Sequence, residues 1–171
     1  AQMGYENTKN ITAAAQKVLA YDHGVMSITS WAMRGWTRQD TIEYIARDKD
    51  VFVDAFAYIN PLYRQRHIFS VSSGIAALII GSRIDPDKAR VFITKLYTGE
   101  ELKAPSVILS LRNKFIEQTN SRSMNPQYKF AITMKALRAY LHDDPLSVLK
   151  FVEGESFPRV EEAPNGRRKK A

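Results

Sequence analysis

Residues 70–84 form the one segment of the chain whose middle is apolar on every side. Its centre reads Ile75-Ala76-Ala77-Leu78-Ile79-Ile80 and carries no charge. A helix that is apolar all round has to be covered by other elements, and this run is shorter than the roughly 20 apolar residues that cross a bilayer. Ser70 precedes it and is of a type favoured at helix N-caps. The pattern predicts a central helix over 70–84.

Six further segments repeat apolar residues at intervals of three and four, which is the spacing of one helix face. Thr37 and Asp40 have the form of a capping box, and Asp85 is an N-cap followed by Pro86 at the first helical position. Gly99 stands where a helix C-terminal cap is expected. The predicted helices cover 10–23, 37–46, 50–59, 70–84, 86–98, 104–117 and 126–142. We therefore predict an all-α protein, a single globular bundle of about six to seven helices around the central one.

Two stretches fall outside this pattern. Residues 25–36 fit a short helix, an extended piece or a packed loop equally well. Near the C-terminus, the apolar residues of 146–152 predict a short strap over the core, and Phe157-Pro158 marks the expected end of ordered chain. The predicted division is a helical domain over 1–158 and a disordered basic tail over 159–171.

The charge of the chain is strongly positive near one end. The formal net charge is +7, and four positive charges stand together at Arg167, Arg168, Lys169 and Lys170. A basic excess favours nucleic acid or an anionic surface as partner, and a basic tail binds nucleic acid through counterion release with little sequence specificity. The same tail is consistent with charge that only keeps the protein in solution.

Two other basic groups suit contacts with the phosphates of double-stranded DNA. Arg64 and Arg66 stand beside an aromatic ring and a histidine between two predicted helices. Lys135 and Arg138 share an outward face of the helix 126–142, loosely joined by Lys129, and such a stripe can follow a phosphate backbone. A solvated surface with local ion pairs is the alternative for both groups. With the tail, these five residues are the candidate nucleic-acid-binding set.

Trp31 and Trp36 are the candidate partner-binding residues. A tryptophan can stack on a base or cage a ligand, and both rings can instead fill the core. The helices 37–46 and 50–59 also have the outline of a helix-turn-helix. A recognition helix presents polar groups near its N-terminus, but this one reads VFVDAFAYI, which argues against a DNA-reading helix.

No catalytic signature is found in the chain. It has no cysteine, which excludes disulfides and thiolate metal sites and suits a reducing compartment. His23, His67 and His142 stand far apart, without a partner at metal-ligand spacing, and no glycine-rich phosphate loop is present. Helix capping accounts for the Asp85 and Asp87 pair. We expect neither an enzyme nor a cofactor or metal site.

The first residues, AQMGYENTK, lack the basic and apolar regions of a signal peptide, and no segment is long and apolar enough to span a membrane. The sequence predicts a cytoplasmic protein with no membrane contact.

Several phrases over residues 4–158 match one known pattern. They are Gly4-Tyr5-Glu6-Asn7, Thr37-x-x-Asp40, SRIDPDKA at 82–89, Phe92, Lys95-Leu96, Thr98-Gly99, Pro105, Leu109, Leu111-Arg112, Phe115-Ile116 and GESFP at 154–158. In these landmarks the chain resembles the helical C-terminal region of phage and plasmid proteins with an N-terminal ParB-like domain, the kind that carries an Asp-Gly-Gln-His-Arg motif.

That motif and its domain are missing here, so no ParB-like nucleotide or nuclease activity carries over to any residue of this chain. The resemblance implies a C-terminal fragment, or a stand-alone relative, with an accessory role in a mobile element's maintenance. Two hypotheses remain: a non-enzymatic DNA-associated module, and a protein-interaction or oligomerisation module, for example a phage-encoded inhibitor, that touches no nucleic acid.

Overall fold

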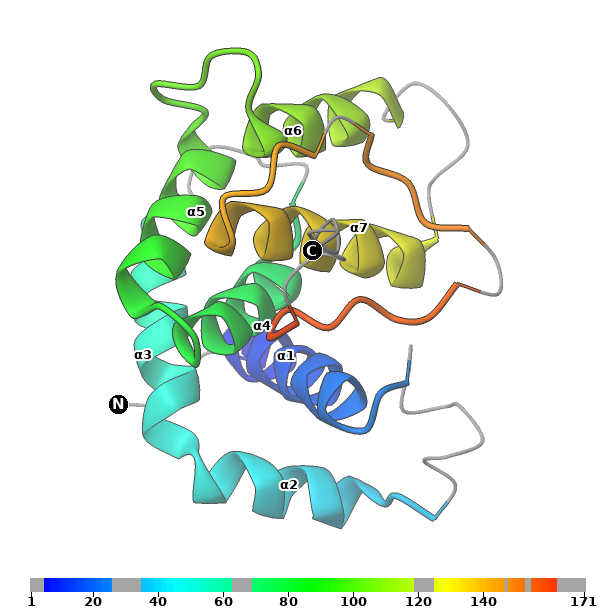
Figure 1. Ribbon diagram of the computed structural model, residues 1–171. Coiled ribbons are helices and arrows are strands. Elements are labelled where there is room, and N and C mark those ends of the chain that lie inside the picture. Colours follow the sequence, from blue (N-terminus) through cyan, green and yellow to red (C-terminus); the bar gives the residue numbers. More distant parts are fainter. Residues whose placement is uncertain are drawn as a thin grey trace.

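The computed structural model describes residues 5–25, 35–62, 69–118, 125–146, 148–152 and 155–162. Within these ranges the chain forms seven helices and no strand, which confirms the predicted all-α fold (Figure 1). The helices are α1 (Tyr5–Asp22), α2 (Arg38–Arg47), α3 (Lys49–Ile59), α4 (Val71–Ser82), α5 (Pro86–Thr98), α6 (Val107–Gln118) and α7 (Pro126–Leu141).

The apolar run occupies the centre of the bundle, as predicted. Helix α4 contacts α1, α3, α5 and α7, and all but two of its twelve residues are buried. Ser70 is its N-cap, with the Oγ accepting a hydrogen bond from the Ser73 amide at 3.1 Å. Because α4 is covered on every side, its apolar faces supply most of the contacts that join the other helices.

The predicted helix starts at Thr37 and Asp85 are confirmed by their caps. Thr37 and Asp40 exchange the two hydrogen bonds of a capping box, and the Asp85 carboxylate accepts from the Lys88 amide at 3.0 Å. Helix α1 begins at Tyr5, five residues earlier than the apolar pattern indicated. Once the packed turns from Ile11 onward are formed, backbone hydrogen bonds extend a helix without apolar residues.

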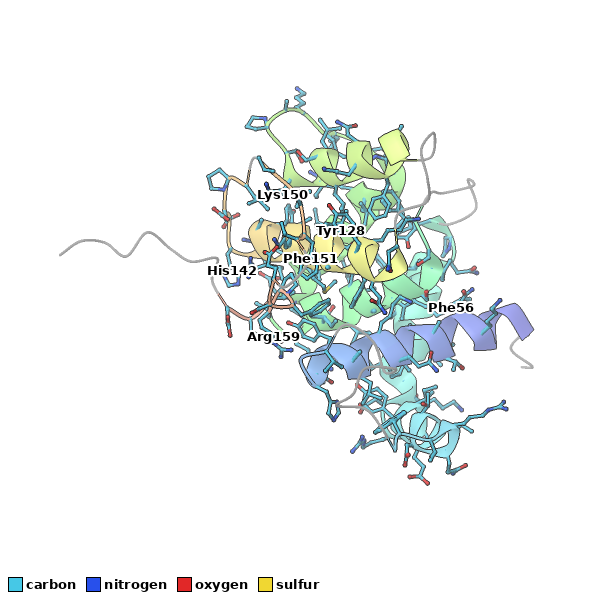
Figure 2. All side chains as sticks on the ribbon, turned by 90° about the vertical axis from the view of Figure 1, so that its right-hand side faces the viewer. Phe56, Tyr128, His142, Lys150, Phe151 and Arg159 are labelled. Carbon is cyan, nitrogen blue, oxygen red and sulfur yellow. The ribbon has the colours of Figure 1, made fainter. Side chains whose placement is uncertain are left out.

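The C-terminal strap, meaning the described residues 148–152 and 155–162, contains no helix. Its first part lies on α7, where the Phe151 ring meets Tyr128 edge-on at 6.5 Å between centroids (Figure 2). Its second part, drawn in red in Figure 1, lies between α7 and α1. There Phe157 packs on Phe130 of α7 at 5.8 Å and on Tyr21 of α1 at 6.0 Å.

Tertiary contacts continue beyond Pro158, where the sequence predicted the end of ordered chain, as far as Glu161. Val160 is fully buried, and its amide donates to the Tyr21 hydroxyl oxygen at 2.7 Å. The Tyr21 hydroxyl in turn donates to the Glu161 carboxylate at 2.6 Å, and Arg159 donates to the Tyr21 carbonyl. These contacts join residues about 140 positions apart, which no local pattern reveals. Residues 163–171 of the predicted tail lie outside the described ranges.

Candidate nucleic-acid interface

A cavity of about 260 Å³ lies at the N-terminal end of α4. Helices α1, α4, α5, α6 and α7 all contribute side chains to its wall. Its polar lining consists of hydroxyls and two ammonium groups, without any carboxylate: Lys17, Ser70, Ser72, Ser73, Tyr97, Lys129 and Thr133. We call it the lysine–serine cavity.

The first turn of α4 gives this cavity its shape. The Ser70 and Ser73 hydroxyls lie 2.8 Å apart, and the Tyr97 hydroxyl donates to the Ser70 carbonyl at 2.9 Å. Gly74 is what allows the tyrosine ring to come so close, since a Cβ at that position would lie 2.1 Å from the Tyr97 oxygen. The hydroxyl groups are therefore held around the helix end by backbone geometry.

Two lysines from different helices line this cavity. Lys17 comes from α1 and Lys129 from α7, and both are half-buried. Among the described residues, neither ammonium forms an ion pair. Burial lowers the pKa of Lys17, because the charged form loses solvation and no acid compensates for the loss.

This arrangement suits an oxyanion. The N-terminus of a helix carries a partial positive charge and directs amide groups outward. Beside it, two lysine side chains and the Ser72 and Ser73 hydroxyls can donate hydrogen bonds to phosphate oxygens, whereas the Ser70, Tyr97 and Thr133 hydroxyls already donate within the protein. No carboxylate that would repel a phosphate lines the cavity.

The residues of the predicted basic stripe on α7 lie in two different environments. Lys129 faces the lysine–serine cavity, whereas the Lys135 ammonium donates to the Lys150 carbonyl at 2.7 Å and to the Glu155 carboxylate of the strap. The Lys135 side chain is 13% exposed. Burial alone would raise the pKa of Glu155, but hydrogen bonds from Lys135 and the Val152 amide outweigh it and lower that pKa. The charge of Lys135 is thus compensated inside the protein.

Arg138 lies near the same strap carboxylate. Its Nε is buried and has no hydrogen-bond partner among the described residues. His142, at the end of α7, contacts the Val160 carbonyl through Nε2 at 2.9 Å. The strap therefore covers the part of the stripe that the helical pattern placed on an outward face.

Trp36 is half-buried and makes contacts within the fold. Its indole Nε1 donates to the Thr41 hydroxyl at 2.8 Å, and its ring meets that of His23 edge-on at 6.3 Å. Trp31 lies outside the described residues, as do the other predicted nucleic-acid residues Arg64, Arg66, Arg167, Arg168, Lys169 and Lys170.

The net charge is unevenly distributed. The described ranges contain 17 lysines and arginines and 17 aspartates and glutamates, so the whole net charge of +7 lies in the remaining ranges. Within the described part, attraction for an anion depends on places where positive charge is locally unopposed. The basic range 63–68 leads directly into Phe69 and Ser70, which line the lysine–serine cavity.

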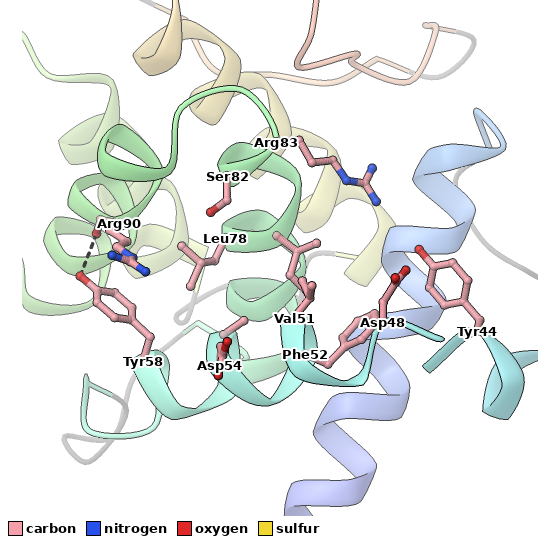
Figure 3. Close-up of a pocket in the computed structure, with 12 residues that line it drawn as sticks. Tyr44, Asp48, Val51, Phe52, Asp54, Tyr58, Leu78, Ser82, Arg83 and Arg90 are labelled. Atoms are coloured by element: carbon pink, nitrogen blue, oxygen red, sulfur yellow. Dashed lines mark hydrogen bonds between the residues drawn. The ribbon is translucent and has the colours of Figure 1, made fainter. Parts of the chain in front are cut away.

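A second and larger hollow lies at the other end of α4. It has a volume of about 470 Å³ and is lined by residues of α2, α3, α4 and α5, with Leu78 of α4 between the α3 and α5 walls (Figure 3). Arg83 at this end is paired with Asp22, Nη1 to Oδ1, at 2.6 Å. We call this hollow the α3–α5 groove.

Sequence reasoning missed Lys17 and Tyr97 as site residues. Each lies in an ordinary helical pattern, and only the packing of α1 and α5 against α4 brings them to one cavity. Ser70 was recognised as an N-cap candidate, which is the one local signal of this site.

No family model matches the chain, and no curated protein or solved structure is found to be similar to it. No helix in the described ranges is long and apolar enough to cross a membrane. In the same ranges, no cluster of histidine and acidic side chains has the arrangement of a metal site.

Proposed function

We propose that this chain is a DNA-associated accessory domain of a phage or plasmid ParB-like protein, and that it contacts DNA phosphates through the lysine–serine cavity. The observation that carries the proposal is the convergence of Lys17 and Lys129 on the N-terminus of α4 without a carboxylate beside them. The proposal gives no residue a catalytic role.

The energetic cost of burying its ammonium supports the assignment of Lys17. A half-buried ammonium without an acid partner is destabilising for the fold. Bound phosphate would compensate Lys17 and raise its pKa again, so binding and ionisation favour each other. Arg64 and Arg66 lie outside the described residues but only a few positions before Ser70 in the sequence, and we propose that they add further phosphate contacts.

The test is duplex-DNA binding across a salt series. Replacing both lysines (Lys17→Gln with Lys129→Gln) should weaken binding at least tenfold and reduce the slope of log K against log salt by about 2, since each lost phosphate contact accounts for about 0.9. The matched control replaces two exposed lysines outside the cavity, Lys103→Gln with Lys150→Gln, and should change the slope by less than half as much.

A shortened chain separates the folded domain from its tail. It should end after Glu162, because Arg159 and Val160 belong to the packed strap. Salt-sensitive binding that survives this truncation supports the proposal. Binding that is lost with the tail, or that is insensitive to the two cavity lysines, contradicts it.

The second candidate is a protein-interaction or oligomerisation module without nucleic-acid contact. It is favoured by the α3–α5 groove, whose floor and walls are largely apolar and which no described residue fills. Failure of both chains to bind DNA at low salt would leave this candidate in first place.

A further inference from the structure

The size of the lysine–serine cavity limits what can enter it. Its volume of about 260 Å³ corresponds to about nine water molecules at about 30 Å³ each. It is smaller than the pockets of about 300–1,000 Å³ that enclose drug-sized ligands. Residues of five helices line it. The cavity can therefore hold one phosphate group and part of the nucleotide that carries it, but not a stretch of duplex.

Part of the cavity wall is apolar. Phe69, Leu96 and Phe115 line it and are buried, and the rings of Phe69 and Phe115 meet edge-on at 4.7 Å between centroids. Apolar groups give a phosphate no replacement for the water that it loses on entering. The polar groups of the same cavity have to compensate its charge, so the charge of the ligand has to match theirs.

The described lining residues supply two positive charges, from Lys17 and Lys129, and no negative one. A phosphate monoester, the form found at the end of a DNA strand, carries a charge of about −1.5 to −2 at pH 7. An internal phosphodiester carries a single negative charge. A monoester therefore compensates both ammonium groups, whereas a diester leaves one of them uncompensated beside apolar groups, which is unfavourable.

The connection of a phosphate to its strand favours the same ligand. An internal phosphodiester continues into the strand on both sides, so both neighbouring nucleotides would have to pass between the helices that line the cavity. A terminal phosphate continues on one side only. Ser73 adds a donor for its oxygens, because the Ser73 Oγ accepts from the Ser70 hydroxyl at 2.8 Å and keeps its own proton for a ligand.

We propose that the lysine–serine cavity binds the terminal phosphate monoester of a DNA strand, with Lys17 and Lys129 compensating its two charges and Ser73 donating to one of its oxygens. This inference rests on the proposed function, because it takes DNA as the ligand and names the part of the DNA that enters the cavity. The internal phosphates next to the end lie outside the cavity. The chain then binds DNA ends in preference to continuous duplex.

The test measures binding of the full chain, by fluorescence anisotropy at low salt, to four DNA forms with the same duplex sequence. Three are hairpins whose open end carries a 5′-phosphate, a 3′-phosphate or only hydroxyls, and the fourth is a ligated dumbbell without an end. At least one phosphorylated hairpin should bind at least tenfold more tightly than the hydroxyl hairpin. The dumbbell should bind no more tightly than the hydroxyl hairpin. Any contribution from residues 163–171 to internal phosphates is common to all four forms.

Variants assign this preference to the cavity. Lys17→Gln with Lys129→Gln should abolish the difference between phosphorylated and hydroxyl hairpins, and Ser73→Ala should reduce it severalfold. The matched control, Lys103→Gln with Lys150→Gln, removes two exposed lysines outside the cavity and should preserve the difference. Circular dichroism and melting temperature check that each variant is folded.

The outcomes separate this inference from the proposed function. Equal affinity for all four DNA forms, with binding that still falls when both cavity lysines are replaced, overturns the inference and leaves the contact with DNA phosphates unaffected. A preference for phosphorylated ends that persists in the Lys17→Gln, Lys129→Gln chain overturns it as well, because the end then binds elsewhere. Binding of every form that is independent of the two lysines contradicts both.

Discussion

The charged side chains at the two ends of α4 differ in whether they are paired within the protein. At the N-terminal end, Lys17 and Lys129 stand beside hydroxyls and have no acid to pair with among the described residues. At the C-terminal end, Arg83 is held by Asp22, and the Tyr44 hydroxyl donates to the same carboxylate at 3.3 Å.

A paired charge stabilises the fold, whereas an unpaired charge is available to bind a ligand. A charged group that is paired within the protein, such as Arg83, stabilises the folded chain. Its charge is already neutralised, so it attracts a ligand only weakly. Uncompensated groups raise that energy until a ligand of opposite charge arrives. Removing a charge at one end of the helix should therefore change stability in the opposite direction from removing a charge at the other end.

The largest effect is expected at Gly74. Gly74→Ala brings a methyl group into the Tyr97 ring and should lower the free energy of unfolding by about 2 kcal/mol, within the range for overpacked sites. Urea denaturation measures it. Adding Tyr97→Phe removes the nearest oxygen and should restore part of the loss.

The matched change at the other end of the helix is Gly81→Ala. Its added Cβ would meet Ala89 at 3.0 Å and Leu137 at 3.2 Å, and the gain in helix propensity offsets part of that crowding. We expect a loss within about 1 kcal/mol. A loss at Gly81 as large as that at Gly74 would mean that the close approach of Tyr97 is not specially constrained.

Asp22→Asn should cause the next largest loss in the free energy of unfolding. It removes the charge that pairs with Arg83 and accepts from Tyr44, and should lower the free energy of unfolding by about 1 kcal/mol, because the pair is partly exposed. Thermal melting at low and high salt measures it. A loss that is the same at both salt concentrations would indicate that the hydrogen bonds, rather than the charge, are responsible.

The pKa of Tyr44 is a measure of the electrostatic surroundings at the C-terminal end of α4. Burial, followed by the Asp22 carboxylate, raises the pKa of Tyr44 from 10.0 to about 12. Between pH 10 and pH 12 the unfolded chain therefore loses a proton that the folded chain keeps, and stability should fall over that window. Asp22→Asn should move the pKa part of the way back towards 10, measured as the difference in ultraviolet titration between Asp22→Asn and Asp22→Asn with Tyr44→Phe. An unchanged pKa would show that burial alone sets it.

The smallest expected effect on the free energy of unfolding is an increase, at Lys17. Lys17→Met removes a desolvated ammonium while keeping an apolar stem of similar length, and should raise the free energy of unfolding by about 0.5–1 kcal/mol. The same change should weaken DNA binding. Chemical denaturation of this variant beside Lys103→Met, an exposed position, provides the comparison, and destabilisation by Lys17→Met would contradict the uncompensated charge.

The sequence predicted the helices well because their signals are local. The apolar run of α4, the capping box at Thr37 and the Asp85-Pro86 start each depend on residues within a few positions of one another. The beginning of α1 at Tyr5 was missed because the apolar period of this helix starts only at Ile11.

The site could be predicted only in part, because its contacts are distant in sequence. Lys129 was predicted as a binding residue from its charge, but Lys17, which lines the same cavity, is 112 positions away in the sequence. Lys135 looked solvated on a helical projection, although the strap residues Lys150 and Glu155 cover it. Periodicity shows which face of a helix is apolar, and does not show which later segment will lie over a polar one.

The most direct test of the account compares the two ends of α4 in one experiment. Two-dimensional amide spectra of the labelled chain, recorded as a short duplex is added at low salt, report each backbone position separately. We predict that the largest shifts occur at Ser72 to Gly74 and around Lys17 and Lys129, and that they disappear in the Lys17→Gln, Lys129→Gln chain. Shifts that are centred on Leu78 to Arg83, or that persist unchanged without the two lysines, would contradict it.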